Sequence, residues 1–244
     1  MPPIPLASPA GRVRAAVSLG LVAVLLLHGC ASAARSTAAR SSAAPPHPVT
    51  AEAISYFLDI AYGSEYGEPG DRLRVWDREV RVRVQGAPTP ADSAEVDRVI
   101  ADINRVVGRR LMSRTVASGN LDVLFVGQDG FDRYARPVAR RNRGYVYISW
   151  NRSSHIQRGI VLVRRDLPLE QRRHAVREEL TQALGLLNDS WRHPESIFFQ
   201  GPSTVTAFSP LDEQVIWLHD QHRARAGARR ASMLQWLTST YLRR

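Results

Sequence analysis

The sequence predicts an α/β domain in which helices lie on a mixed β-sheet. Two observations carry this prediction. The predicted segments follow the order helix, strand, helix, three further strands and a helix, which is too irregular for a doubly wound fold. In addition, 44% of the 244 residues are hydrophobic, which is enough apolar material for a core. No glycine-rich loop follows a predicted strand, so nucleotide-binding motifs are absent.

Two amphipathic helices are predicted in the first part of the domain, over about 51–62 and 92–110. In both segments apolar residues recur every three or four positions, which places them on one helix face. Four strands are predicted from strictly alternating or apolar runs. They cover residues 79–85, 121–126, 144–150 and 159–163.

A third helix is predicted between Asp166, as its N-cap, and Gly185, which ends it, with Pro168 in the first turn. Its apolar side chains form one stripe, and Glu178 and Gln182 lie almost opposite that stripe. His174, one turn earlier, is expected to be solvated. A last helix is predicted over about 230–242, as a small C-terminal helical part of the domain.

The amino terminus predicts an export signal rather than a membrane span. Arg12 and Arg14 precede an apolar run of 13 residues, which is too short to cross a bilayer. The following segment, 27–30, resembles a bacterial lipoprotein cleavage box. This resemblance implies a signal peptide over 1–29 and lipidation of Cys30. A flexible tether over 30–50, without aromatic residues, would then lead to a folded domain over 51–244.

The cysteine and charge counts exclude several classes of protein. A single cysteine excludes a disulfide framework and thiolate zinc sites. All 33 basic residues are arginine, and the formal charge is +10. Because an exported protein does not meet the chromosome, an anionic envelope polymer or lipid is a better partner for this charge than nucleic acid. The arginines expected to grip it lie in a predicted loop over 133–143 and are Arg133, Arg136, Arg140, Arg141 and Arg143.

The segment 178–190 resembles the active-site helix of the metzincin metallopeptidases, and more closely its matrixin form. In this comparison Glu179 stands at the position of the general base and Gly185 at that of the turn glycine. Glu178, Gln182 and Asn188 stand where the three histidine ligands belong. Further on, 196–198 resembles the Met-turn, with Phe198 in place of methionine. The framework is therefore present without its histidines.

The whole pattern is closer to the bacterial domain of unknown function 2927. Separated motifs carry this resemblance in the same order, among them F-L-D-I-A-Y-G-S-E-Y-G over 57–67 and E-E-L-T-Q-A-L-G-L-L-N-D over 178–189. It implies a secreted or lipid-anchored envelope protein with a zincin-like fold, and it supplies no reaction. The alanine after Cys30 favours the outer membrane if the cell has two membranes.

The residues of the motif leave several functions open. Glu178, Gln182, Asn188 and Asp189 offer only oxygen ligands, which suit calcium or magnesium better than zinc. Alternatively, they hold a turn by hydrogen bonds and no cofactor binds. We expect non-catalytic binding or scaffolding at the cell envelope. The alternatives are a metallopeptidase in which Glu179 is the general base, and an arginine-mediated binder of anionic polymer or lipid.

Overall fold

The computed structural model describes residues 44–66, 70–137 and 140–243. All of them belong to one of the two units into which the chain divides, residues 40–244. The other unit, residues 1–39, contains the predicted signal peptide and Cys30 and lies outside the described residues, as does most of the predicted tether. Within the described part of the chain, no helix is both long and apolar enough to cross a bilayer.

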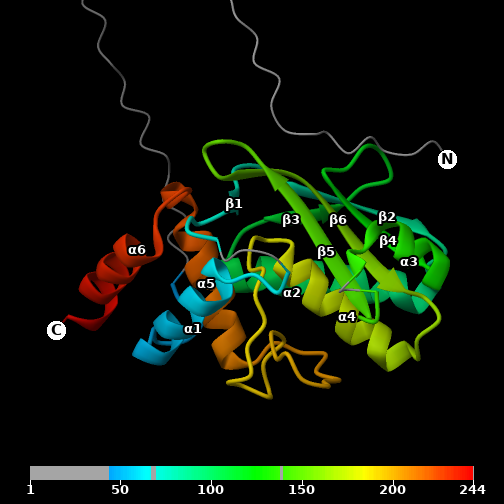
Figure 1. The fold of residues 1–244 in the computed structure, drawn as a ribbon. Coiled ribbons are helices and arrows are strands. Elements are labelled where there is room, and N and C mark those ends of the chain that lie inside the picture. Colours follow the sequence, from blue (N-terminus) through cyan, green and yellow to red (C-terminus); the bar gives the residue numbers. More distant parts are fainter. Residues whose placement is uncertain (1–43, 67–69, 138–139, 244) are drawn as a thin grey trace, which may run out of the picture. The chain divides into compact units, whose positions relative to one another are not determined.

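Six strands form one mixed sheet (Figure 1). Four neighbouring strands are parallel, in the order β6 (His155–Arg164), β4 (Leu121–Val126), β2 (Val80–Gly86) and β3 (Met112–Arg114). The short strand β1 (Val75–Trp76) pairs in parallel with the start of β6. Strand β5 (Gly144–Trp150) pairs antiparallel with β6. The mixed α/β class predicted from the sequence is therefore confirmed.

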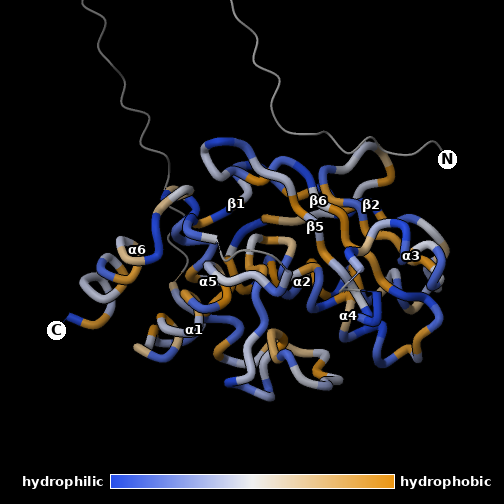
Figure 2. The backbone as a smooth tube through the Cα atoms, viewed as in Figure 1, coloured by the Kyte–Doolittle hydropathy of each residue, from blue (hydrophilic) through white to orange (hydrophobic). Residues whose placement is uncertain are grey.

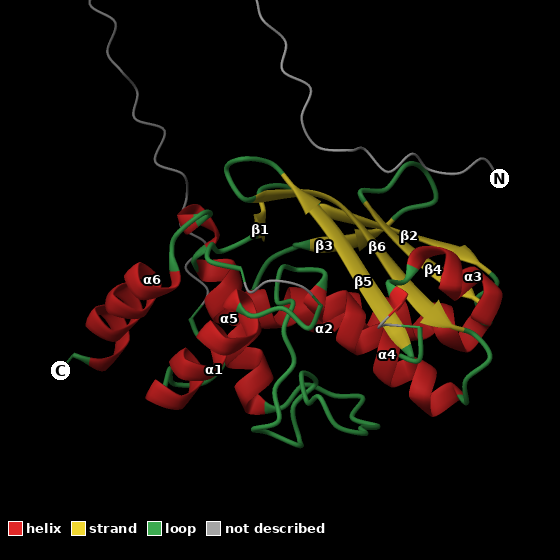
Figure 3. Ribbon diagram, viewed as in Figure 1, coloured by secondary structure: helices red, strands yellow, loops and turns green. Residues whose placement is uncertain are grey.

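The helices form two groups (Figure 3). Helix α2 (Pro90–Val107) packs on α4 (Leu169–Gln182), and α4 packs on β5 and β6. Helix α1 (Ala51–Tyr62) packs on α5 (Pro210–Gln221) and α6 (Arg230–Leu237). A π-helical turn over Thr238–Leu242 continues α6, and two short elements complete the fold, α3 (Gln128–Tyr134) and a 3-10 turn over Arg223–Arg225.

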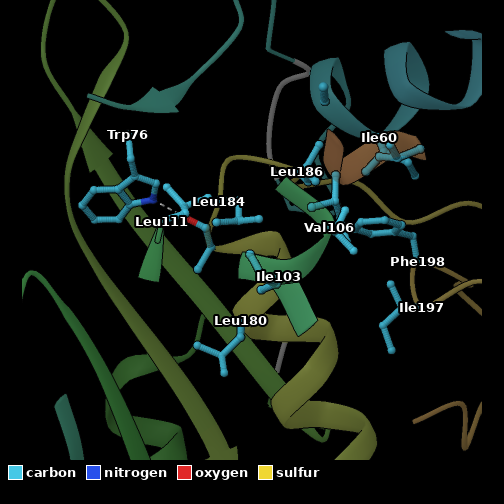
Figure 4. Packing of buried hydrophobic residues seen from close by; sticks show 14 of the residues in the cluster. Ile60, Trp76, Ile103, Val106, Leu111, Leu180, Leu184, Leu186, Ile197 and Phe198 are labelled. Atoms are coloured by element: carbon cyan, nitrogen blue, oxygen red, sulfur yellow. Dashed lines mark hydrogen bonds between the residues drawn. The ribbon is translucent and has the colours of Figure 1, made fainter. Parts of the chain in front are cut away.

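The core lies between the sheet and the helices, where the apolar stretches of the chain converge (Figure 2). Leu180 and Leu184 of the α4 region and Ile103 of α2 are fully or almost fully buried there (Figure 4). The Trp76 indole Nε1 donates a hydrogen bond of 2.9 Å to the carbonyl oxygen of Ala183. This bond joins β1 to the carboxyl end of α4.

Three predictions about the elements need correction. Asp166 is not the N-cap of α4, because its carboxylate binds the Arg164 guanidinium and the helix begins after Pro168 without a side-chain cap. The predicted loop over 133–143 begins inside α3, whose only buried residue is Phe131. The last predicted strand extends from His155 to Arg164, because its first residues pair with β1 and β5.

Candidate functional site

The carboxyl end of α4 is shaped by Gly185. Its φ of 114° lies in the left-handed region, and a Cβ there would come within 2.4 Å of the Arg74 carbonyl oxygen. A glycine is therefore needed at this position. The Gly185 and Leu186 amides still donate to the Gln182 carbonyl oxygen, and the chain then turns back. This turn brings residues 188–191 beside α1 and next to the polar side chains of α4.

Two of the predicted ligands hold this turn in place. The Gln182 amide Nε2 donates a hydrogen bond of 2.6 Å to Asp189 Oδ1. The Asn188 side-chain amide donates a bond of 3.2 Å to the Asp59 carbonyl oxygen, on α1. The structure therefore brings Gln182 and Asp189 together and directs Asn188 to a different element.

The predicted metal-ligand set of Glu178, Gln182, Asn188 and Asp189 takes part in several separate contacts in this structure. Glu178 Oε2 lies 3.4 Å from His174 Nε2, and the side-chain NH2 groups of Gln182 and Asn188 donate to Asp189 Oδ1 and to the Asp59 carbonyl oxygen. Across the described residues, no three side chains of histidine, cysteine, aspartate or glutamate are grouped so that they could hold a metal ion.

Four carboxyl groups around α4 affect one another electrostatically, and we call them the carboxylate cluster. They belong to Glu65, Glu178, Glu179 and Asp189. Burial raises the pKa of Asp189 to about 8, and the charge of Glu65 contributes. The pKa of Glu178 is raised well above its ordinary value by burial and by Asp189, while Arg143 opposes the shift. Burial also raises the pKa of Glu65, which accepts a hydrogen bond of 3.1 Å from Asn142. The cluster therefore favours protons or a cationic group.

Glu179 is the most enclosed member of this carboxylate cluster. The residue is 6% exposed, and its side chain packs on Gly144, where a Cβ would come within 2.5 Å of its Cγ and Oε1. Its pKa is raised well above the ordinary value by burial, and the charge of Glu178 adds to the shift. Its carboxylate has no hydrogen-bond donor among the described residues. Such a group is suited to accepting or donating a proton.

Two members of the site were missed or misplaced by sequence reasoning. Glu65 was not singled out, although it lies inside the motif over 57–67, because nothing in the spacing shows that this loop reaches α4. His174, expected to be solvated, is 3% exposed, and its Nδ1 lies 2.7 Å from the Val205 carbonyl oxygen. The segment after the turn folds back over the polar face of α4, and it covers this side chain.

A groove of about 750 Å³ begins at the turn. Asn188, Asp189 and Trp191 line one side, and residues of α1 and the start of α6 line the others. Trp191 is 68% exposed. Its ring packs edge-to-face against the ring of Phe199, with a centroid distance of 5.8 Å. The groove therefore combines an exposed indole with carboxylate and amide groups.

The segment that resembles the Met-turn is part of the core rather than of the carboxylate cluster. Phe198 is fully buried and packs edge-on against Tyr56. Ser196 Oγ accepts a hydrogen bond from the Tyr56 hydroxyl and donates one of 2.5 Å to Asp212 Oδ1. These contacts join α1, the segment and the first turn of α5.

The predicted anionic-surface arginines divide into two kinds. Arg143 is partly buried, and its Nη1 donates a hydrogen bond of 2.5 Å to the Ser203 carbonyl oxygen. The others are exposed. They are Arg133, Arg136, Arg140 and Arg141.

Comparison with known families gives one match. A family model described as "Protein of unknown function (DUF2927)" matches residues 50–239. The search of curated proteins found no match.

Proposed function

The chain belongs to the DUF2927 family, and from this premise we propose that it is a lipid-anchored envelope protein that binds a partner without cleaving peptide bonds. In this proposal the fold is related to the zincins, and the site is a metzincin site that has lost its metal ligands. The mixed sheet, α4 packed against it and the turn at Gly185 support the relationship.

One observation carries the non-catalytic part of the proposal. The side chains at two of the three histidine positions, Gln182 and Asn188, hold the turn after α4 through hydrogen bonds. A catalytic zinc needs firm protein ligands and an open position for water. Neutral amide oxygens bind zinc poorly, and the NH2 groups of these two amides tie the side chains to Asp189 and to the Asp59 carbonyl oxygen. The residues at this site therefore do not fit zinc.

The groove beside the turn is where we place binding. The hydrogen bonds of Gln182 and Asn188 order the turn that precedes Trp191, so less backbone ordering is needed when a ligand contacts the exposed indole. A large aromatic side chain next to hydrogen-bonding groups is typical of binding surfaces. We propose a component of the cell envelope, a polymer or a protein, as the ligand.

This binding can be measured by co-sedimentation of the full-length chain with purified, insoluble cell-wall polymer. Trp191→Ala should reduce the sedimented fraction by at least about tenfold, as expected for loss of a central aromatic contact. Trp150→Ala is the matched control, because Trp150 is also exposed, at 45%, and does not line the groove. Equal sedimentation of the two variants would exclude the groove as the binding site for this polymer.

The second candidate is a hydrolase in which Glu179 is the general base, and the burial of its unpartnered carboxylate favours it. Elemental analysis of the purified full-length chain, together with a peptide-cleavage assay, separates the two candidates. The non-catalytic proposal predicts no stoichiometric zinc and no cleavage. Stoichiometric zinc with cleavage that Glu179→Gln abolishes would establish the hydrolase instead.

As a third candidate function, we propose that the exposed side chains of Arg133, Arg136, Arg140 and Arg141 bind anionic polymer or lipid. Such binding is electrostatic and must weaken with salt. The full-length chain carrying Arg140→Gln and Arg141→Gln should bind anionic vesicles less tightly at low salt than the unmodified chain. Binding that neither salt nor the double substitution changes would reject this surface.

A further inference from the structure

Helices α2 and α4 pack side by side (Figure 1), and residues of both line a second, smaller pocket that shares no lining residue with the groove. Its volume is about 250 Å³. Glu95 and Arg98 of α2, Arg173 and Arg177 of α4, and Thr206 of the segment that covers α4 line it. Every lining residue is polar or charged, and three of them are arginines.

The positive charge of this arginine pocket exceeds the negative charge around it. Glu95 Oε2 accepts two hydrogen bonds from Arg98, of 2.5 and 3.0 Å. It lies 3.9 Å from Arg173 Nε, and Glu95 Oε1 lies 3.5 Å from Arg177 Nη2. Among the residues that the structure describes, one further carboxylate is in contact, that of Asp102, which lies 2.8 Å from Arg177 Nη1. Three guanidinium groups therefore share two carboxylates, which leaves one uncompensated positive charge.

Several polar atoms of the pocket are buried without a hydrogen-bond partner among the described residues. They include Nε of Arg173, Nε and Nη1 of Arg177, and Oε1 of Glu95. The Nη1 atom is close to Asp102 but outside hydrogen-bond geometry. Arg177 is only 3% exposed, and its guanidinium lies over the Phe208 ring at 4.6 Å, which fixes its plane. Buried donors and acceptors without partners are costly, so a ligand that reaches them by displacing the exposed side chains of Arg98 and Arg173 would bind favourably.

We infer that the arginine pocket binds a phosphate group that carries a proton, either inorganic phosphate or a phosphomonoester. The unprotonated oxygens of such a group accept hydrogen bonds from the arginines, which suit phosphate because of their planar arrangement of donors. Its hydroxyl group donates to Glu95 Oε1, which is the unpartnered buried acceptor among the described residues that line this pocket. Sulfate is an anion of similar size and shape, but it has no proton near neutral pH, and the Glu95 carboxylate would repel it.

Isothermal titration of the purified full-length chain tests this inference. Inorganic phosphate should bind, and sulfate should bind at least about tenfold more weakly. Arg98→Gln and Arg173→Gln should each weaken phosphate binding about tenfold, the effect of losing one charge-assisted hydrogen bond. Both side chains are substantially exposed, at 52% and 40%, so these variants are expected to fold. Circular dichroism verifies the folding.

The matched control is Arg114→Gln. Arg114 also pairs with a carboxylate of α2, Asp97, but it does not line the pocket, so its replacement should leave phosphate affinity unchanged. Glu95→Gln tests the selectivity. It should bring the affinities for sulfate and phosphate within a few fold of each other, because an amide can donate to sulfate and carries no charge.

Glycerol phosphate, titrated at pH 6 so that about half of it carries a proton, distinguishes the two sources of the ligand. If it binds as tightly as inorganic phosphate, the site accepts a phosphomonoester, and if only inorganic phosphate binds, the ligand is the free ion. Absence of phosphate binding at millimolar concentration to the folded full-length chain would overturn the inference. So would phosphate binding that neither Arg98→Gln nor Arg173→Gln weakens.

Discussion

At the scale of single residues, the candidate site depends on a glycine whose role is set by its backbone. Gly185 has a left-handed φ and lies against the Arg74 carbonyl oxygen, so it both permits the turn and brings β1 close to α4. The sequence predicted that this glycine ends the helix. It could not show that the residue is also in close contact with another element, because that contact joins positions far apart in the chain.

Replacing Gly185 with alanine should lower the free energy of unfolding by about 1–3 kcal/mol, because the backbone conformation and the contact at 2.4 Å both oppose a Cβ. Urea unfolding measures the change. Gly127→Ala is the control, since φ there is −74° and the nearest atom to an added Cβ is 3.7 Å away. Equal effects of the two substitutions would contradict the role given to Gly185.

The carboxylate cluster gives the protein a predicted pH dependence. The pKa of Asp189 rises from 3.8 to about 8 on folding, so between these values the folded state binds a proton that the unfolded chain has lost. The free energy of unfolding should therefore fall as the pH rises from about 4 to about 8. The slope from one group cannot exceed about 1.4 kcal/mol per pH unit. Glu178, Glu179 and Glu65, whose pKa values are also raised by burial, add to the decline.

Urea unfolding at several pH values tests this dependence. Asp189→Asn, which keeps an oxygen to accept the hydrogen bond of Gln182, should make the decline less steep. Asp129→Asn, at an exposed position on α3, should leave the slope as it is. A free energy of unfolding that rises over this pH range in the unmodified chain would show that ionisation of the carboxylate cluster does not destabilise the folded state.

At the scale of the elements, regular and well-buried segments could be predicted and short or covered ones could not. The bounds of β4 and β5 agree with the predictions, because each is an apolar or alternating run long enough to show its period. Strands β1 and β3 have only two and three residues, and their pairing with distant strands is what makes them strands.

The polar face of α4 shows a different limit of sequence reasoning. Its pattern predicted one buried stripe and one solvated face, yet His174, Arg177 and Gln182 are all buried. The segment that leads from the turn to α5 covers this face through Val205 and Phe208. Helical periodicity cannot reveal such a cover, because the covering segment has no periodicity of its own.

Helix α5 provides a prediction about capping. Ser209 and Asp212 form a capping box at its first turn, and Asp212 also accepts hydrogen bonds from Ser196 Oγ and the Ile197 amide. Ser209→Ala should cost about 1 kcal/mol of stability. Asp212→Ala should cost about 3 kcal/mol, because it also leaves buried donors without a partner. Thermal unfolding compares them, and similar costs would show that the link to residues 196–197 contributes little.

At the scale of the whole molecule, the proposed anchor precedes the described domain. If Cys30 is lipidated, Cys30→Ser should move the full-length chain from the membrane fraction to the soluble fraction of the bacterial cell, as detected by immunoblotting. Arg40→Gln, close in sequence but outside the cleavage box, should stay with the membrane. Retention of the Cys30→Ser protein on membranes would show that another part of the chain attaches it.

The contact between Gly144 and Glu179 has a consequence for comparing members of the family. Because a Cβ at position 144 would come within 2.5 Å of the Glu179 side chain, the two positions cannot both hold large residues in this backbone. Family members with alanine or a larger residue at position 144 should have a residue shorter than glutamate at position 179. In an alignment, substitutions at positions 144 and 179 should therefore occur together. They would divide the family into chains with glycine at position 144 and glutamate at position 179, and chains with neither residue.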